Sequence, residues 1–566
     1  MFVAILSLIY MCFISFTLGL LVKRVMSRVI KADIDMIMAL GIMASTVYAQ
    51  SFSIFYRVNI ECNIILLLIS LVSLILCRED VKELFERARN SDIEVVRYRV
   101  FLLVILILFV AAISATEPLD YDSYLYHNQA IQWIERYGLV KGLGNLHHRF
   151  AYNSAMMSLQ ALFGFSFIGR SIHQVNGFIC LLALYYVFCD LYLYRKAELL
   201  KKEFRASYII KASMFFYILL NLQSISSPGT DFAPTIFFMY ICGKWQEACE
   251  DKRQQTFYYL APSLLAVFCV TLKLSVLPIA FLTFYLLYEL LKKNKTKQAV
   301  IMLVGDLVIV LPYLIRNVII SGYLLYPMEK LDLFKVDWKM PKALVSADRE
   351  EIKLCGREIL HQSELNSSLK AWVQVWFKSL NLIERGIFCL TLLMICLVIL
   401  SFIYKRFIKG NSKPGEVNEV YLQRESVLLT VLIIAFFYWF LSAPSIRFGM
   451  GVLLCLIAVA AGLLFGNSVK GAYTGMLFVF SLITLTSYSD GLMLSEANLI
   501  YPTDYKQFEC EEVSYETKKG DSIIIYRPKE GDQSGYDVFP ESPDADPKYL
   551  RLRGDSLKDG FMAIAE

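Results

Sequence analysis

The sequence predicts an all-α protein that crosses a membrane many times. Of its 566 residues, 57% are hydrophobic, whereas soluble globular chains average about 45–50% apolar residues. The hydrophobic residues form about fourteen separate runs of the length and character that membrane helices require. Lysines and arginines fall mainly between these runs, which is the arrangement of a multi-pass membrane protein.

The expected spans follow one another along most of the chain. They are residues 2–22, 34–52, 62–77, 100–115, 174–194, 207–225, 231–243, 255–271, 273–291, 298–320, 386–404, 426–443, 447–466 and 471–488. The first run is long enough to cross a bilayer and is followed by Lys23 and Arg24 without a small-residue cleavage site. We therefore expect a membrane helix there and not a cleaved signal peptide.

The basic loops set the expected orientation. They are residues 23–31, 78–99, 195–205, 244–253, 292–297 and 405–424. With the spans above, all of them lie on one side, which the positive-inside rule identifies as cytoplasmic. This orientation requires that segment 151–167, which carries Asn153, Ser158 and Gln160, does not span; we expect a re-entrant or interfacial helix. The net charge of +5 reflects these loops, and we expect no nucleic-acid partner.

The opposite, outer face should hold three loops and a tail. The segments are 116–173, 226–231, 321–385 and 489–566. The tail is expected to be a small folded unit with a strand at 522–526, because turn-forming Gly-Asp pairs flank this β-branched run. Most of the 13 cysteines lie in apolar runs and are read as small hydrophobic residues. Cys355 and Cys510 lie in outer segments, where they would either pair or remain free.

Segment 117–149, EPLDYDSYLYHNQAIQWIERYGLVKGLGNLHHR, concentrates acidic, histidine and aromatic residues beside a membrane span. Asp120 and Asp122 follow a turn-prone Pro118. Either acid would serve as a general base or would hold a metal or a substrate hydroxyl; the alternative is a solvated loop acid or a helix N-cap. Residues 128–137 should form a short amphipathic helix in the membrane interface.

The same loop carries a cationic group made of His127, His147, His148 and Arg149. Arginine binds phosphate in a bidentate manner, and neutral histidines donate hydrogen bonds to it. A histidine is also a common metal ligand. The alternative is that these side chains only pack in the interface.

Four more charged residues lie at the expected outer ends of spans: Lys273, Arg316, Arg447 and Asp231. Charges near the bilayer are costly unless they face a cavity, a partner or the interface. The three cations would suit the phosphate of a lipid-linked substrate, or they would only anchor the interface. Asp231 follows a Pro-Gly turn and would either cap a helix or line the same outer cavity.

These motifs together resemble those of the GT-C superfamily of integral-membrane glycosyltransferases, in particular its bacterial members. The resemblance rests on DYDSYLYH in the first large outer loop, SSPGTD at the outer end of a later span, IRNVIISGYLLYP before a long outer loop, and APSIRFGMG late in the chain. It covers residues 100–488. It divides the chain into added N-terminal helices (1–97), a GT-C-like core (98–488) and an extracytoplasmic tail (489–566).

The resemblance implies a polyprenyl-phosphate or polyprenyl-pyrophosphate sugar donor and a glycan or lipid acceptor. It places a catalytic base in the first outer loop, at Asp122 in preference to Asp120. It implies that Lys273, Arg316 and Arg447 bind the donor phosphate. Some members of the superfamily need a divalent metal and others do not; we expect no cofactor and no metal here.

The resemblance further implies an inverting transferase in the bacterial inner membrane, with its active site on the periplasmic face and a role in cell-envelope polysaccharide assembly. Two alternatives stay open at this point. One is an O-antigen-type polymerase or ligase, which also uses outer-loop arginine and histidine residues. The other is a transporter of lipid-linked glycans, although we see neither internal repeats nor polar residues gathered at the midplane, as transporters show.

Overall fold

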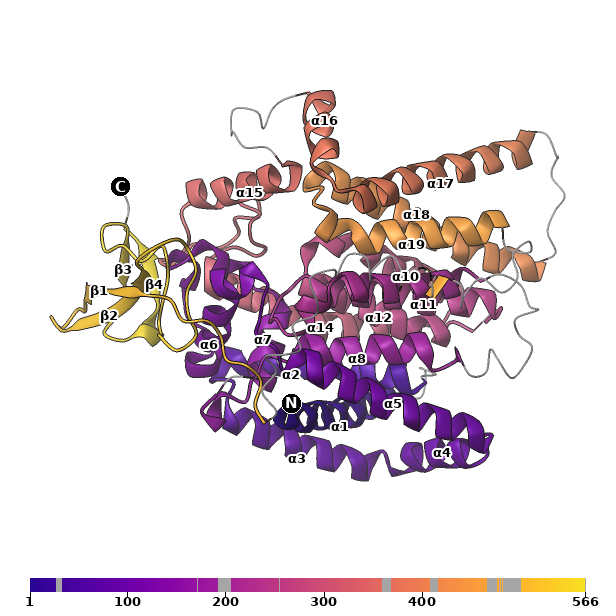
Figure 1. The fold of residues 1–566 in the computed structure, drawn as a ribbon, viewed down its shortest axis with the longest axis horizontal. Coiled ribbons are helices and arrows are strands. Elements are labelled where there is room, and N and C mark those ends of the chain that lie inside the picture. The colour runs from indigo at the N-terminus through magenta and orange to yellow at the C-terminus, as the bar shows by residue number, and fades with distance from the viewer. Residues whose placement is uncertain are drawn as a thin grey trace.

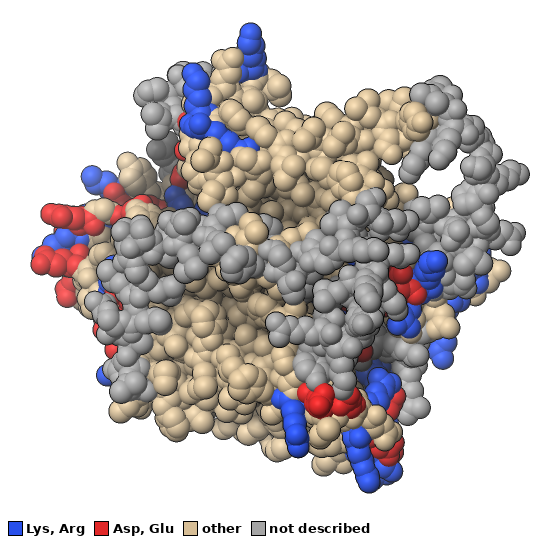
Figure 2. Space-filling model, turned by 45° about the vertical axis from the view of Figure 1, so that its right-hand side comes forward, with Lys and Arg blue, Asp and Glu red and all other residues tan. Residues whose placement is uncertain are grey.

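The structure is a bundle of long helices with a small β region at one end (Figure 1). This computed structural model describes residues 1–26, 33–170, 172–191, 205–253, 255–358, 368–407, 416–465, 476–477, 479, 481 and 500–564. Figure 2 shows charged side chains gathered towards the ends of the molecule and a broad uncharged area between them. This distribution is that of a membrane protein whose middle faces lipid.

Eight helices of the described chain are long and apolar enough to cross a bilayer, or nine if a bent pair counts as one span. The eight are α1 (Phe2–Val25), α2 (Ile34–Phe55), α5 (Ile93–Ser114), the unit Leu274–Lys292, α14 (Thr296–Ser321), α17 (Leu382–Phe407), α18 (Glu416–Ser442) and α19 (Ile446–Phe465). The unit Leu274–Lys292 joins the 3₁₀ segment η7 (Leu274–Ala280) to α13 (Phe281–Lys292). The bent pair is α3 (Ile60–Leu76) with α4 (Arg78–Arg89).

Four expected spans are helices that do not meet this criterion. They are α8 (Val175–Phe188), α10 (Ala206–Leu220), α11 (Phe232–Glu250) and α12 (Phe257–Leu272). Three are short, and α11 carries Lys244, Glu247 and Glu250 in its last turns. Most of their side chains are buried among other helices, so they need no long lipid-facing run. The expected span at 471–488 lies largely outside the described residues.

The first two helices are part of the core of the bundle. They cross closely, since a Cβ at Gly19 would lie 1.9 Å from the carbonyl oxygen of Ile37, and one at Gly41 would lie 1.7 Å from that of Ser15. Small residues allow this approach of helix backbones. At its two ends α2 also bonds to later helices, through Asp35 to α11 and through Ser53 to α14.

The segment between α5 and α8 contains only short helices. They are the π-helix η1 (Ser123–His127), α6 (Asn128–Tyr137), the 3₁₀ segments η2 (Leu143–Asn145), η3 (His148–Tyr152) and η4 (Ser166–Ile168), and α7 (Ala155–Phe163). With nine residues, α7 is about 14 Å long and too short to span. This short length agrees with the expectation that 151–167 does not cross the membrane.

Helix α6 has the predicted bounds but not the predicted surroundings. Its polar face is not in the membrane interface, because Gln129, Gln132 and Glu135 are at most 1% exposed. The amide of Gln129 donates to the carbonyl oxygens of Gly535 and Val538 at 2.7 and 2.8 Å. The C-terminal tail therefore covers this face.

The tail is a small β unit, as the sequence predicts. It contains β1 (Cys510–Glu516), β2 (Ser522–Pro528), β3 (Leu550–Leu552), the turn η10 (Leu557–Asp559) and β4 (Phe561–Ala563). Strands β1 and β2 pair antiparallel, as do β3 and β4. Trp133 of α6 packs edge-on against Phe539 and Phe561 of the tail, which fixes the unit on the loop. Cys355 and Cys510 are free thiols.

Two further helices lie near the same end of the bundle as the tail. They are α15 (Lys342–Arg357) and α16 (Leu369–Ser379). Trp376 of α16 donates from its ring nitrogen to the carbonyl oxygen of Pro444 at 2.7 Å. This bond holds the long segment after α14 close to the turn between α18 and α19.

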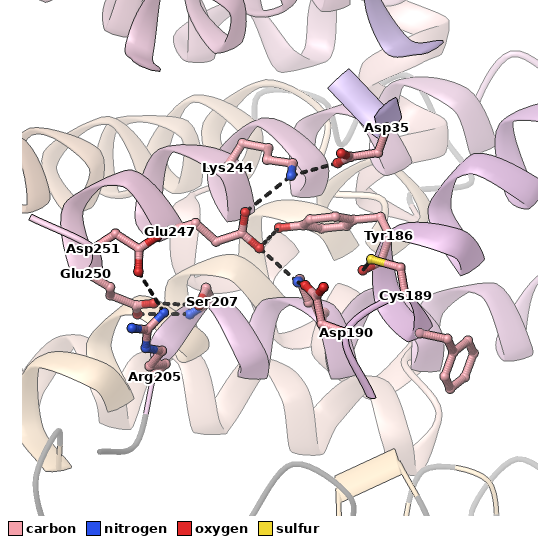
Figure 3. A network of polar contacts seen from close by, with 12 residues as sticks. Asp35, Tyr186, Cys189, Asp190, Arg205, Ser207, Lys244, Glu247, Glu250 and Asp251 are labelled. Atoms are coloured by element: carbon pink, nitrogen blue, oxygen red, sulfur yellow. Dashed lines mark hydrogen bonds and ion pairs between the residues drawn. The ribbon is translucent and has the colours of Figure 1, made fainter. Parts of the chain in front are cut away.

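The other end of the bundle is held together by a buried network of charges (Figure 3). Lys244 contacts Asp35 at 2.6 Å and Glu247 at 3.3 Å. Glu247 also contacts Lys211 at 2.9 Å and accepts a hydrogen bond from the hydroxyl of Tyr186 at 3.0 Å. These residues come from α2, α8, α10 and α11, so the network ties four helix ends together.

Candidate functional site

A cavity of about 690 Å³ opens near the tail end of the bundle. Its wall comes from the loop after α5, the ends of α12, α14 and α18, the starts of α11 and α19, and α15. Six of the ten candidate site residues singled out in the sequence line it: Asp122, Arg149, Asp231, Lys273, Arg316 and Arg447. The other four, Asp120, His127, His147 and His148, are not part of its lining.

Four of the lining residues form a chain of alternating charge. Arg447 lies 3.2 Å from Asp122 through one terminal nitrogen and 2.8 Å from Asp231 through Nε. The other carboxylate oxygen of Asp231 contacts the ammonium of Lys273. Lys273 also lies over the ring of Phe448, 3.7 Å from its centroid. Two acids therefore balance two cations at one side of the cavity.

The turn before α11 places Asp231 in this chain. The side-chain amide of Asn176 donates to the carbonyl oxygens of Ser227 and Gly229, at 2.8 and 3.0 Å. A Cβ at Gly229 would lie 2.9 Å from Oδ2 of Asp120. A side chain at this position would contact that carboxylate closely, so glycine lets the turn lie directly against Asp120.

Asp120 belongs to the support of this turn and not to the cavity wall. Its carboxylate accepts a hydrogen bond from Ser224 at 3.3 Å, and its backbone N–H donates to the hydroxyl of Ser227 at 3.1 Å. Burial raises the pKa of Asp120 to about 6. The structure thus separates the two loop acids: Asp122 faces the cavity, and Asp120 holds the loop against the turn.

His127 lies behind the cavity and is almost completely buried, at 1% exposure. Its Nε2 is 3.5 Å from the hydroxyl of Thr230. Burial lowers the pKa of His127 to about 4, so the ring is neutral at pH 7. It therefore packs beneath Asp122 and Asp231 and brings no positive charge to a phosphate.

Arg316 differs from the other cations because it has no carboxylate partner among the described residues. It is 2% exposed and lies on the last turns of α14. Its Nε donates to Oδ1 of Asn153 at 2.9 Å, and a terminal nitrogen donates to the hydroxyl of Ser53. Both partners are neutral. An isolated buried charge is costly, so this guanidinium lies in the cavity wall without the counter-charge that would offset its burial.

The sequence did not single out several polar residues at the mouth of the cavity. Glu351 of α15 accepts from Arg149 at 2.7 Å. Asp532 of the tail lines the cavity and accepts from the hydroxyl of Tyr121. No local pattern marks these acids, because each one reaches the site through a tertiary contact spanning hundreds of residues.

The two adjacent loop histidines face the tail. Nδ1 of His147 is 2.7 Å, and Nδ1 of His148 3.2 Å, from Oδ2 of Asp544. Nε2 of His148 is 3.6 Å from Oδ1 of Asp348 on α15. Within the described chain, His147, His148 and Asp544 form one group that could hold a metal ion, and His148, Asp348 and Glu351 form another.

The helices and the cavity together define a multi-pass membrane protein with a charged site near one end of its bundle. The chain belongs to the family described as Domain of unknown function (DUF8201), whose model matches residues 1–454. That stretch starts with α1, ends within α19 and holds all six charged cavity residues named above. No curated protein and no solved structure matches the chain.

Proposed function

We propose that the protein is an inverting membrane glycosyltransferase. It moves a sugar from a polyprenyl-phosphate or polyprenyl-pyrophosphate donor to a glycan or lipid acceptor. The proposal places about fourteen membrane helices, which include a GT-C-like core, in a bacterial inner membrane, with the cavity on the periplasmic side. It rests on the sequence motifs that resemble the GT-C superfamily and on the charges that meet in one cavity.

The observation that carries the proposal is the guanidinium of Arg316 in the cavity wall, which has no carboxylate partner among the described residues. A phosphate would supply the missing counter-charge, and arginine binds phosphate through two parallel hydrogen bonds. Lys273 and Arg447 already have carboxylate partners. We therefore propose that Arg316 is the main phosphate-binding residue. Lys273 and Arg447 then position the carboxylates of Asp231 and Asp122.

The rest of the cavity suits a substrate with an apolar part. Leu274, Ile320, Trp439 and Phe448 are among the many apolar side chains in its wall. They come from η7, α14, α18 and α19, and all four elements belong to the helices or units long and apolar enough to cross a bilayer. A polyprenyl chain could thus lie against apolar wall while its phosphate meets Arg316.

Asp122 is the assigned base because it is the loop acid that lines the cavity. Its carboxylate takes the proton of the acceptor hydroxyl, and the oxygen attacks the anomeric carbon from the face opposite the phosphate. The bond between the anomeric carbon and the phosphate oxygen breaks, and its electron pair leaves with the phosphate. Arg316 stabilises the charge that develops there.

The test is sugar transfer in proteoliposomes from a polyprenyl-phosphate donor, with Asp122→Asn and Asp120→Asn compared at matched protein levels. Asp122→Asn keeps the shape but cannot accept a proton, so transfer should fall by roughly 10²–10⁴-fold. Asp120→Asn should lose less, since Asp120 shapes the turn. Near-normal transfer by Asp122→Asn would overturn the assignment. Activity only with a pyrophosphate-linked oligosaccharide would favour the polymerase or ligase alternative.

A further inference from the structure

Two parts of the chain that are about 400 residues apart bring three metal-ligand atoms together. They belong to His147, His148 and Asp544, and one ligand atom from each residue lies within 4.8 Å of the other two. Both ring nitrogens face the same carboxylate oxygen, at 2.7 and 3.2 Å. The group lies beside the cavity and is not part of its lining.

The chemistry of this group fits a transition-metal ion. Imidazole nitrogen and carboxylate oxygen bind zinc at about 2.0–2.2 Å, so two ligands of a tetrahedral ion stand roughly 3.3 Å apart. The distance from His148 to Asp544 is already close to this value, and that from His147 would lengthen by a fraction of an ångström. Calcium and magnesium prefer oxygen ligands alone.

A second set of contacts, around His148, also supports a metal site. Histidines that bind a metal usually donate their other ring N–H to a carboxylate, which fixes the ring. Nε2 of His148 points to the buried carboxylate of Asp348 at 3.6 Å. Asp348 in turn accepts from the hydroxyl of Tyr152 at 2.8 Å. Asp348 is therefore placed to orient the ring of His148.

An ion could reach this position from solvent. The side chain of Asp544 is 47% exposed, whereas that of His147 is 2% exposed. The two rings therefore form a fixed wall, and the open side of the carboxylate leaves room for one or more water ligands. This is the coordination of a site with three protein ligands and solvent in the remaining position.

We propose that His147, His148 and Asp544 bind one divalent transition-metal ion of the zinc class, which clamps the C-terminal tail to the first outer loop. Asp348 orients His148 from α15. Arg149, the next residue in the chain, lines the cavity and pairs with Glu351 of α15. The ion therefore fixes the tail, the loop and α15 at the mouth of the cavity.

The experiment measures metal binding to the full-length protein in detergent, with Zn²⁺ for stoichiometry and Co²⁺ as a spectroscopic probe. Wild type should bind one ion per chain and show the visible bands of a nitrogen and oxygen site. Asp544→Asn should lose the ion, while Asp348→Asn should weaken binding about 10–100-fold. Asp521→Asn is the matched control, since Asp521 is an exposed tail acid outside the group.

Thermal unfolding gives the second measurement, because an ion that binds only the folded state raises the unfolding temperature. Zn²⁺ should raise it in wild type and in Asp521→Asn, and should leave Asp544→Asn unchanged. Equal binding and equal shifts in Asp544→Asn would overturn the proposal. So would a thiolate charge-transfer band with Co²⁺, or the absence of binding in wild type. None of these measurements depends on sugar transfer, so either proposal can fail alone.

Discussion

Replacing Arg316 by glutamine tests whether the guanidinium of this residue binds an anionic ligand. In most buried ion pairs, removal of one partner costs about 3–5 kcal/mol because it leaves the other charge unpaired. Arg316 has only Asn153 and Ser53 as hydrogen-bond partners in the described chain. Arg316→Gln therefore leaves no buried carboxylate without a partner. It should change the free energy of unfolding of the donor-free protein by less than about 1 kcal/mol.

Arg424→Gln is the matched control for this stability measurement. Arg424 is fully buried like Arg316, but its Nε contacts the carboxylate of Glu289 at 3.2 Å. Its replacement leaves a buried carboxylate without its main partner, and the expected loss is about 3–5 kcal/mol. Thermal unfolding of both variants in the same detergent gives the comparison.

Ligand binding is expected to rank the two variants in the opposite order. A hydrogen bond to a charged group contributes about 1.5–3 kcal/mol, which is roughly 10–150-fold in the dissociation constant at about 1.4 kcal/mol per tenfold. Arg316→Gln should therefore bind polyprenyl phosphate about 10–150-fold more weakly than wild type, as measured by titration in nanodiscs. Unchanged affinity, or a stability loss as large as that of Arg424→Gln, would refute the reasoning.

Three further predictions concern the rest of the fold. Burial raises the pKa of Glu135 from 4.5 to about 8. Between these two pH values the carboxyl group is protonated in the folded state and ionised in the unfolded state, so the free energy of unfolding should fall as pH rises. In Glu135→Gln, thermal unfolding from pH 5 to 8.5 should show a smaller fall. Glu247→Gln removes one carboxylate partner from the buried ammonium groups of Lys211 and Lys244, and should lower the free energy of unfolding by about 3–5 kcal/mol. The exposed Glu83→Gln should lower it by only about 0–1 kcal/mol; thermal unfolding measures both. In intact cells, an impermeant maleimide should label Asp521→Cys above the wild-type background but not Arg87→Cys; the reverse result would invert the orientation.

Local patterns in the sequence predicted the helical membrane fold and much of the site. Eight expected spans match helices that meet the length and hydropathy criterion, and a ninth matches α3 of the bent pair. Helix α6 has the predicted bounds, and β2 contains the predicted strand. Hydropathy could not show that α8 and α10 are short helices in the centre of the bundle, because burial by lipid and burial by protein select the same residues. The polar face of α6 was predicted to lie in the membrane interface, but the C-terminal tail covers it. A sequence pattern shows which residues are polar and does not show what covers them.

In the candidate site, too, some features could be predicted from the sequence and others needed the fold. Charges at span ends indicated Lys273, Arg316 and Arg447, and the structure places all three in one cavity. The sequence preferred Asp122 to Asp120 only by resemblance, and the fold adds the separate positions of the two acids. Asp120 bonds to Ser224 and Ser227 of the turn, whereas Asp122 lines the cavity. The contact of His147 with Asp544 was beyond sequence reasoning, because nothing local links the loop to a tail 397 residues away.

The most direct test of the account is an experimental structure of the protein with polyprenyl phosphate bound in a nanodisc. The account predicts phosphate density within hydrogen-bond distance of the Arg316 guanidinium, with Asp122 facing the same space and the prenyl chain along the apolar wall. Lipid phosphate bound elsewhere, with Arg316 still facing an empty cavity, would contradict it.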